Sequence, residues 1–439
     1  MIAILANRTY RHLFAAQVIA LVGTGLATVA LGLLAWQLAG ADAGMVLGTA
    51  LAIKMVAYVT LAPIATALAE RVPRRAMLIA LDLIRAAVAL ALPFVTEVWQ
   101  VYALIFLLQA ASAGFTPTFQ AVIPDVLPDE AAYTRALSLS RLAYDLESLL
   151  SPLLAAALLT VVGFPVLFGG TVLGFLASAL LVASTRLPAP EPAPRRPFGA
   201  RLTRGLRIYL ATPRLRGLLA LNLAVAAAGA MVIVNTVVLV KARLGLGEPQ
   251  VALALAAFGA GSMISALALP RLLERTGDRP AMLAGAILLT LGMLAGPMAD
   301  ALPPLLMLWA ALGLGYGLVL TPAGRLLRRS AQAADRPALF AAQFALSHAC
   351  WLVTYPLAGR LGAGMGLDAA FLVMALLSGL GLVLALRLWP ASAGGSVPHA
   401  HPDLPPDHPH LMAHGGALHA HPWVIDDLHP SWQSRPARA

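Results

Sequence analysis

The stretch Glu70-Arg71-Val72-Pro73-Arg74-Arg75 is a charged hexapeptide between two apolar runs, 44–68 and 76–95. A helix needs about 20 residues to cross the hydrocarbon core of a bilayer, and both runs reach that length. A short basic gap between two such runs is typical of a turn on the cytoplasmic side of a membrane. Of all 439 residues, 60% are hydrophobic and 11% are charged. Because soluble proteins carry about 25% charged residues, this composition argues against a soluble fold.

Outward from the hexapeptide, apolar runs of membrane-spanning length recur along most of the chain. They predict an all-α integral membrane protein with twelve transmembrane helices. The predicted spans are 12–38, 44–68, 76–95, 98–122, 136–160, 164–185, 215–240, 250–272, 281–299, 303–325, 338–359 and 366–389.

The distribution of basic residues predicts the orientation. Twelve spans put both termini on one side of the membrane. That side holds 24 of the 30 Lys and Arg residues, and the opposite loops hold three. The positive-inside rule therefore places both termini in the cytoplasm. Because the formal charge of +10 is explained by topology, we expect the lipid bilayer as a partner, no nucleic acid and no obligatory protein partner.

Local signatures recur at nearly one offset, which indicates an internal repeat. The pattern of the hexapeptide returns 204 residues later, and two proline signatures return 205 and 204 residues later. Three matches in the same order predict two six-helix parallel halves with a substrate site between them, near the bilayer midplane. The pairs are Glu70-Arg71-x-Pro73-x-Arg75 with Glu274-Arg275-x-Gly277-x-Arg279, Thr116-Pro117 with Thr321-Pro322, and Ser151-Pro152 with Tyr355-Pro356.

These patterns divide the chain into four regions: a first half at 1–185, a cytoplasmic linker at 186–213, a second half at 214–389 and a tail at 390–439. The linker begins with alternating prolines, which favour an extended chain. Apolar and basic residues then alternate at helical spacing, so the segment is either a short helix on the membrane surface or a solvated basic linker. The tail has many prolines and few large apolar residues, which predicts disorder.

Over residues 1 to about 390 the sequence resembles the major facilitator superfamily. The resemblance rests on the loop signature at Glu70 to Arg75, on its repeat and on the twelve spans. It implies alternating access between two six-helix halves, controlled by a conformational loop motif. Residues assigned to that motif by the resemblance are Glu70, Arg71, Arg74, Arg75, Asp82, Glu274, Arg275 and Arg279.

Charged residues near the middle of a span cost about 2.5–3.5 kcal/mol each to insert, so they are functional candidates. Span 136–160 contains Arg141, Asp145 and Glu147. Arg141 and Asp145 are four residues apart and can neutralise each other. Glu147 lies about 200° around the helix from Asp145, without a basic partner on its own helix. Glu147 is therefore either a proton-exchanging carboxyl group or the partner of Lys54 in span 44–68.

Polar residues in the second half are further candidates. His348 lies near the middle of span 338–359. It is either a metal ligand that faces Glu147 across a cavity or a hydrogen-bonded packing residue. Asn222 and Asn235 in span 215–240 either line the cavity or bond neighbouring helices together.

Eight of the ten histidines fall in the final 41 residues, and six of them form three His-x-His pairs. Paired imidazoles chelate Ni²⁺, Cu²⁺, Zn²⁺ or Co²⁺. The tail is therefore either a metal-capture segment for transport or a metal buffer unrelated to it. The candidate ligands are His399, His401, His408, His410, His414, His419, His421 and His429.

With this tail, and with the segments 135–148 and 348–351, the chain resembles the nickel-resistance exporters of the superfamily. The resemblance implies proton-coupled efflux of Ni²⁺, and of Co²⁺ as a second candidate, across a bacterial inner membrane. It implies no enzyme activity and no cofactor besides the transported ion. Two alternatives stay open: a drug or siderophore exporter with an incidental metal-binding tail, and a metal sensor that does not transport.

Overall fold

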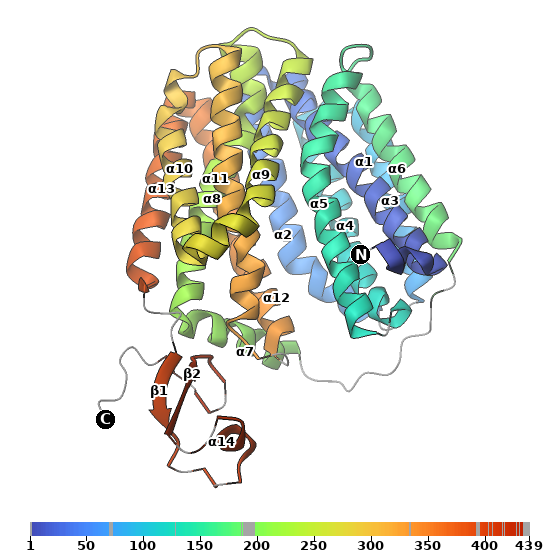
Figure 1. The fold of residues 1–439 in the computed structure, drawn as a ribbon. Coiled ribbons are helices and arrows are strands. Elements are labelled where there is room, and N and C mark those ends of the chain that lie inside the picture. The colour runs from blue at the N-terminus through green and yellow to red at the C-terminus, as the bar shows by residue number, and fades with distance from the viewer. Residues whose placement is uncertain are drawn as a thin grey trace.

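The structure is a computed structural model, and its helices agree with the predicted spans (Figure 1). In the part of the chain that it describes, twelve helices have 18 residues or more, one for each span. This confirms the all-α membrane fold. The described residues are 2–69, 73–127, 129–185, 187, 198–332, 335–391, 396–402, 404–405, 407–414, 416, 418–426, 428–429 and 431–432.

The first half contains α1 (Arg8–Ala39), α2 (Ala43–Ala69), α3 (Arg74–Ala91), α4 (Val98–Val126), α5 (Glu130–Leu158) and α6 (Pro165–Ala183). The linker forms α7 (Phe198–Ala211). The second half contains α8 (Pro213–Val238), α9 (Glu248–Thr276), α10 (Asp278–Ala295), α11 (Leu302–Arg328), α12 (Arg336–Met365) and α13 (Leu367–Leu388). Short turns of 3-10 helix are η1 (Ile2–Ala6), η2 (Gly40–Asp42), η3 (Leu92–Phe94) and η5 (Gly296–Met298), and η4 (Leu239–Arg243) is a π-helical turn.

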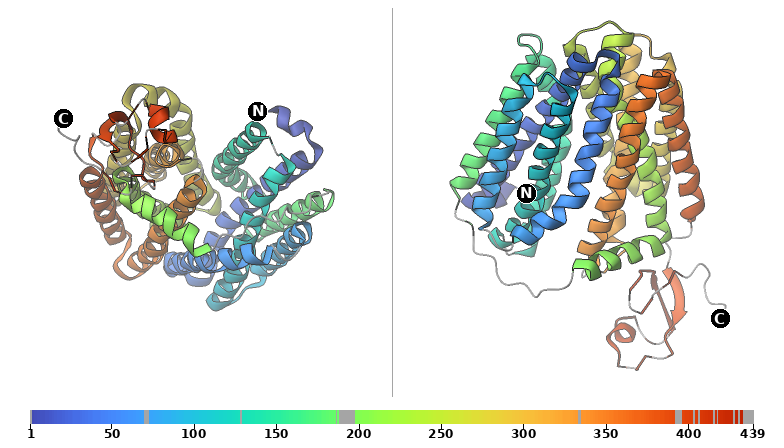
Figure 2. Two further views of the ribbon diagram at one scale, coloured as in Figure 1. Left: turned by 90° about the horizontal axis from the view of Figure 1, so that it is seen from below. Right: turned by 180° about the vertical axis from the view of Figure 1, so that it is seen from behind.

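The two halves pack their helices in the same pattern. In the first half, α1 contacts α5 and α6, α2 contacts α4, and α3 contacts α4 and α6. In the second half, α8 contacts α12 and α13, α9 contacts α11, and α10 contacts α11 and α13. Each of these helix pairs in the first half therefore has a counterpart in the second half, with both helix numbers higher by seven. This is expected for two parallel repeats. The halves stand side by side when the bundle is viewed from behind and from below (Figure 2).

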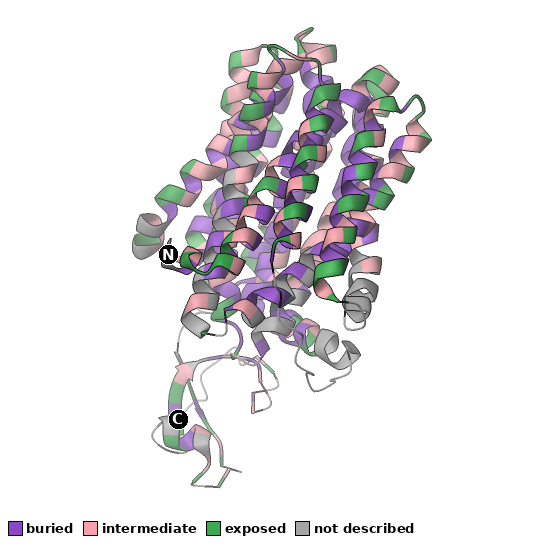
Figure 3. Cartoon of the chain, turned by 90° about the vertical axis from the view of Figure 1, so that its right-hand side faces the viewer, coloured by how far each residue is buried: buried purple, intermediate pink, exposed green. Residues whose placement is uncertain are grey.

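The core lies between helices, while many residues on the outer faces are exposed (Figure 3). Nine stretches of the described residues are long and apolar enough to cross a membrane. The first of them, Arg8–Tyr58, runs through α1 and into α2. α5 and α12 are not among the nine, and these helices carry the central Glu147 and His348.

α2 and α12 join the two halves at positions without side chains. A Cβ atom added at Gly48 of α2 would collide with the carbonyl oxygen of Tyr355 in α12. A Cβ added at Gly359 of α12 would collide with the carbonyl oxygen of Gly44. Small residues allow the backbones of membrane helices to approach closely, so these glycines set the distance between the halves.

Replacing Gly48 with alanine should lower the free energy of unfolding by about 1–3 kcal/mol, because the added methyl group must push α2 away from α12. The measurement is thermal unfolding of the purified variant in detergent. Gly32→Ala is the matched control, since its Cβ would lie 3.9 Å from its nearest neighbour, Leu47 Cδ2. Equal unfolding temperatures for the two variants would contradict the prediction.

The linker contains a helix, α7, which packs against the N-terminal end of α12. Arg204 forms an ion pair with Asp335, and the hydroxyl of Tyr209 donates a hydrogen bond to Gln343. Tyr209 and Ile208 are buried. The helical interpretation of this segment is therefore supported, and the helix is joined to the second half rather than solvated on all sides.

The prediction of a disordered tail differs from the structure. The described residues between 396 and 432 form a small C-terminal lobe with β1 (Ser396–Ala400), α14 (Pro409–His414) and β2 (Leu418–Pro422). β1 and β2 pair antiparallel, with His399 opposite His419. Figure 2 shows the lobe below the second half. The tail is short of apolar residues, but Trp423 and Ile425 are 3% and 2% exposed and pack with the main core, which composition alone does not reveal.

Candidate transport site and metal centre

Glu147 on α5 lies beside α1 and close to Lys54 of α2. A Cβ added at Gly25 of α1 would come within 2.5 Å of Glu147 Oε1, so the absence of a side chain there makes room for the carboxylate. The charges of Glu147 and Lys54 attract each other. The two groups interact electrostatically across the helices, but no ion pair within 4.0 Å joins these two described side chains, so both interpretations of Glu147 stay open.

Lys54 also lies near His348 of α12, across the boundary between the halves. Its ammonium group is 5.9 Å from the ring centre of Tyr58, and that ring stacks on His348 at 6.2 Å. Lys54 and His348 interact electrostatically. Lys54 therefore lies within electrostatic range of Glu147 of the first half and of His348 of the second. We refer to Glu147, Lys54, Tyr58 and His348 as the central cluster.

The ring of His348 has a defined hydrogen-bonding state. Its Nδ1 lies 2.7 Å from the carbonyl oxygen of Phe344, and the two rings are 3.9 Å apart. Because a carbonyl oxygen only accepts hydrogen bonds, Nδ1 carries the proton and Nε2 of the neutral ring keeps its lone pair. A histidine in this state can accept a proton or bind a metal ion through Nε2.

Other predicted cavity residues are placed elsewhere or lie outside the described side chains. Asn235 is fully buried and donates to the carbonyl oxygen of Ala358, so it bonds α8 to α12. Asn222 is also buried, at 2% exposed. Asn235 therefore fits the interhelical role, whereas the buried amide nitrogen of Asn222 has no hydrogen-bond partner among the described residues. The side chains of Arg141 and Asp145 lie outside the described residues.

Asp82, assigned to the loop motif by resemblance, pairs within the first half. It forms an ion pair with Arg85 one turn along α3 and accepts a hydrogen bond of 2.7 Å from Ser178 of α6. The guanidinium group of Arg85 lies 4.0 Å from the ring centre of Phe115 and 4.5 Å from that of Phe175. This environment favours a structural role for the pair.

The loop motif of the second half centres on a residue that the sequence reasoning missed. Asp278, at the start of α10, forms ion pairs with Arg325 at 2.6 Å and with Arg329 at 3.2 Å. The sequence feature that could have identified Asp278 is its position directly after Gly277. This glycine has a φ of 78° and lies between α9 and α10. Arg279 donates to the carbonyl oxygen of Trp389 instead.

The remaining members of the loop motif have few described contacts. Arg75 donates to the carbonyl oxygen of Ala183 and Arg74 lies in the first turn of α3, while Arg275 is exposed. Glu70 and Arg71 lie outside the described residues, as does the side chain of Glu274.

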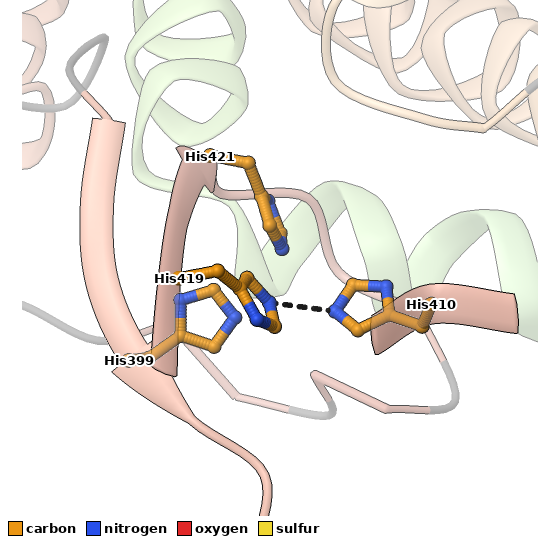
Figure 4. A group of neighbouring side chains, drawn as sticks. All are labelled: His399, His410, His419 and His421. Atoms are coloured by element: carbon orange, nitrogen blue, oxygen red, sulfur yellow. Dashed lines mark hydrogen bonds between the residues drawn. The ribbon is translucent and has the colours of Figure 1, made fainter. Parts of the chain in front are cut away.

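Histidines of the C-terminal lobe converge on one point (Figure 4). Residues two apart on a strand share a face, so His419 and His421 project from β2 on the same side. β1 contributes His399 and α14 contributes His410. The histidines of the His-x-His pairs thus come together in one cluster only because β1 and β2 pair.

Two sets of four imidazoles could each hold a metal ion, and within each set the ligand atoms all lie within 4.8 Å of one another. Together they form the histidine cage. The first set is His399, His410, His419 and His421, and the second is His399, His401, His410 and His429. His408 belongs to neither set among the described residues, and its Nδ1 accepts a hydrogen bond from the backbone N–H of His410. The side chain of His414 lies outside the described residues.

Ring nitrogens in the cage lie at the separation of neighbouring metal ligands. His429 Nε2 is 3.0 Å from His399 Nε2 and 3.1 Å from His401 Nε2. His410 Nε2 is 3.0 Å from His419 Nε2. Nδ1 of His429 is 2.8 Å from Asp426, whose carboxylate directs the other nitrogen of this ring into the cage.

The cage favours neutral imidazoles. Burial, followed by the charges of neighbouring imidazoles, lowers the pKa of His410 to about 4. The same causes lower the pKa of His401. Burial raises the pKa of Asp426, but hydrogen bonds from His429 outweigh it and hold that pKa below its usual value. At neutral pH the rings of His401 and His410 therefore carry the lone pairs that metal binding requires, near the ionised carboxylate of Asp426.

The two matching halves and the central cluster at their boundary define a multi-pass membrane transporter. The profile of the Major Facilitator Superfamily matches residues 13–239 and again 218–423, and the chain belongs to this family. The double match agrees with the internal repeat.

Comparison with individual proteins gives more distant similarity. Macrolide efflux protein A of Streptococcus pyogenes is 27% identical over 181 residues, which are 40% of this chain and 44% of that protein. The chain therefore matches less than half the length of this relative. A bacterial homolog of the human lysosomal transporter Spinster, inward-facing and unoccupied, superposes with a TM-score of 0.69 at 13% identity, over 87% of this chain and 98% of that one. A mutant of the nucleoside transporter NupG gives a TM-score of 0.65 at 12% identity, over 87% and 98%. These structures share the fold.

Proposed function

We propose that the protein is a secondary active exporter of a divalent transition-metal cation, Ni²⁺ first and Co²⁺ second, driven by inward proton flow. It would confer metal resistance from the inner membrane of a bacterium, with both termini in the cytoplasm. The observation that carries the proposal is the histidine cage, because four converging nitrogen ligands have no role in a drug exporter. The cytoplasmic assignment is supported by the distribution of basic residues.

The donor set of the cage supports a borderline transition metal. Imidazole nitrogens suit Ni²⁺, Cu²⁺ and Zn²⁺, and His429 Nε2 lies within hydrogen-bond distance of His399 Nε2 and His401 Nε2. Ni²⁺ is proposed first because of the resemblance of the sequence to the nickel-resistance exporters.

The central cluster supports proton-coupled transport. Glu147 offers a carboxylate and His348 offers Nε2, one from each half, and Lys54 interacts with both. A dication entering between them would compete with Lys54 for Glu147. Protonation of Glu147 from the outer side would then remove the negative charge and release the ion outward. Since the two ligands lie on opposite halves, relative movement of the halves would separate them.

Expression in a nickel-sensitive bacterium is expected to lower cell-associated Ni²⁺ by severalfold and to raise nickel tolerance. Accumulated Ni²⁺, Co²⁺, Zn²⁺ and Cu²⁺ are measured in parallel with growth on a drug panel. A metal sensor without transport would leave accumulation unchanged. Unchanged nickel content in expressing cells would contradict the proposed function.

The second candidate is a proton-coupled exporter of an organic solute, and the similarity to macrolide efflux protein A favours it. The same fold serves both classes. The two are distinguished by the drug panel: an organic-solute exporter would raise tolerance to a drug and leave nickel tolerance unchanged.

A further inference from the structure

The C-terminal lobe is attached to the transporter body at the start of α8. Arg214 donates to Ser330 Oγ and to the carbonyl oxygen of Arg329, both next to the end of α11. The same guanidinium group donates to the carbonyl oxygen of Trp423 in the lobe and lies 5.6 Å from the ring centre of Trp432. One buried arginine therefore joins α8, the end of α11 and the lobe.

A second contact reaches the carboxylate that supports a candidate metal ligand. Gln332, just after α11, donates a hydrogen bond of 2.6 Å to Asp426 Oδ2. The other oxygen of this carboxylate accepts from the backbone N–H groups of Leu428 and His429 and lies 2.8 Å from His429 Nδ1. Gln332 thus holds the carboxylate that orients His429 in the cage.

Trp423 provides a third link between body and cage. It is 3% exposed and packs edge-on against His399 and His429, each with its ring centre 4.7 Å away. Its carbonyl oxygen is the one that Arg214 holds. Two of the four ligands in the second set therefore rest on a residue that is fixed to the transporter body.

We propose that Arg214 and Gln332 of the transporter body are positioning residues of the metal centre in the lobe, so that the affinity of the histidine cage depends on its attachment to the second half. The inference rests on the proposed metal binding of the cage. Without the attachment, His429 and His399 must be ordered at the moment of binding, and that ordering weakens affinity. Because linkage is reciprocal, bound metal also strengthens the attachment of the lobe.

The attachment places the cage at a fixed distance from the cytoplasmic ends of α8 and α11. A metal ion captured there travels with the second half during alternating access, rather than on a loose tether. Asp278 forms an ion pair with Arg329, and Arg214 donates a hydrogen bond to the carbonyl oxygen of Arg329. The loop motif of the second half and the lobe are therefore connected through Arg329 and Arg214.

Gln332 gives the sharpest test because its side chain is exposed and its replacement leaves the helices intact. Full-length Gln332→Leu lacks the donor, whereas Gln332→Lys can still donate to Asp426. Ni²⁺ is titrated into each purified protein, with binding followed by equilibrium dialysis and by quenching of tryptophan fluorescence. Trp423→Phe identifies the part of the quenching that arises beside the cage.

We expect Gln332→Leu to bind Ni²⁺ about 10–100-fold more weakly, the usual effect of losing support for a metal ligand. Gln332→Lys should stay near the wild-type affinity, although its positive charge alone would weaken binding of a dication. Equal affinity of wild type and Gln332→Leu would overturn the proposal, and so would equal losses in both variants. A wild-type protein that binds no Ni²⁺ at the lobe would also overturn it, whereas the proposed function is tested separately by proton-driven Ni²⁺ transport.

Discussion

Glu147→Gln is expected to lose proton-driven Ni²⁺ transport, by more than about tenfold in initial rate. The substitution keeps the shape of the side chain but removes its charge, its ability to release a proton and its attraction for Lys54. Contacts to a charged group contribute about 1.5–3 kcal/mol, which corresponds to a factor of about ten or more. The measurement is Ni²⁺ uptake into inside-out vesicles whose interior is acidified.

A matched control for this loss is Asp300→Asn, since that carboxylate is exposed between α10 and α11. It should transport at the wild-type rate. His348→Ala should lose transport together with Glu147→Gln, because the proposed site takes one ligand from each half. If Glu147→Gln retained the wild-type uptake rate under an acid gradient, Glu147 would have no part in coupling.

The helical framework was predictable because it depends on patterns within short stretches of sequence. Predominantly apolar runs of membrane length predicted each long helix, with ends that differ from the structure by up to six residues. The offset of about 204 residues between signatures predicted the repeat, and the matching contacts of α1–α6 and α8–α13 agree with it. Both predictions use only residue type and spacing, which the chain carries locally.

Contacts between distant residues could not be predicted in this way. Asp278 and Arg329 are 51 residues apart, and Arg214 and Trp423 are 209 apart. Neither pair has a periodic pattern that marks it. The lobe was interpreted as disordered for the same reason, because its buried Trp423 and Ile425 pack with the main core of the protein, which no local pattern reveals.

The central cluster is an intermediate case. Glu147 and His348 were recognisable as isolated polar groups in apolar spans, and Lys54 was recognisable as one alternative partner. What the sequence did not show is that Lys54 interacts with both of them at once. That arrangement depends on tertiary packing, because α2 packs against α12 across the boundary while α5 packs against α1 and α9.

Replacing both His399 and His410 with alanine is expected to weaken Ni²⁺ binding to the lobe by at least about a hundredfold. The two residues are shared by both four-imidazole sets, so each set keeps only two ligands. Loss of a residue that merely supports a ligand costs about 10–100-fold, and loss of two ligands exceeds that. Affinity is measured on the full-length protein by competition with a coloured chelator.

His408→Ala is the matched control because it removes an imidazole from the same segment but from neither set. If the cage delivers metal to the transport site, the double variant should raise KM for Ni²⁺ and leave kcat unchanged, since the central cluster is intact. A lower kcat would instead mean that the cage takes part in translocation. Equal losses of affinity in His408→Ala and in the double variant would show that the histidines bind metal by number alone, and the paired strands would then have no role in building the site.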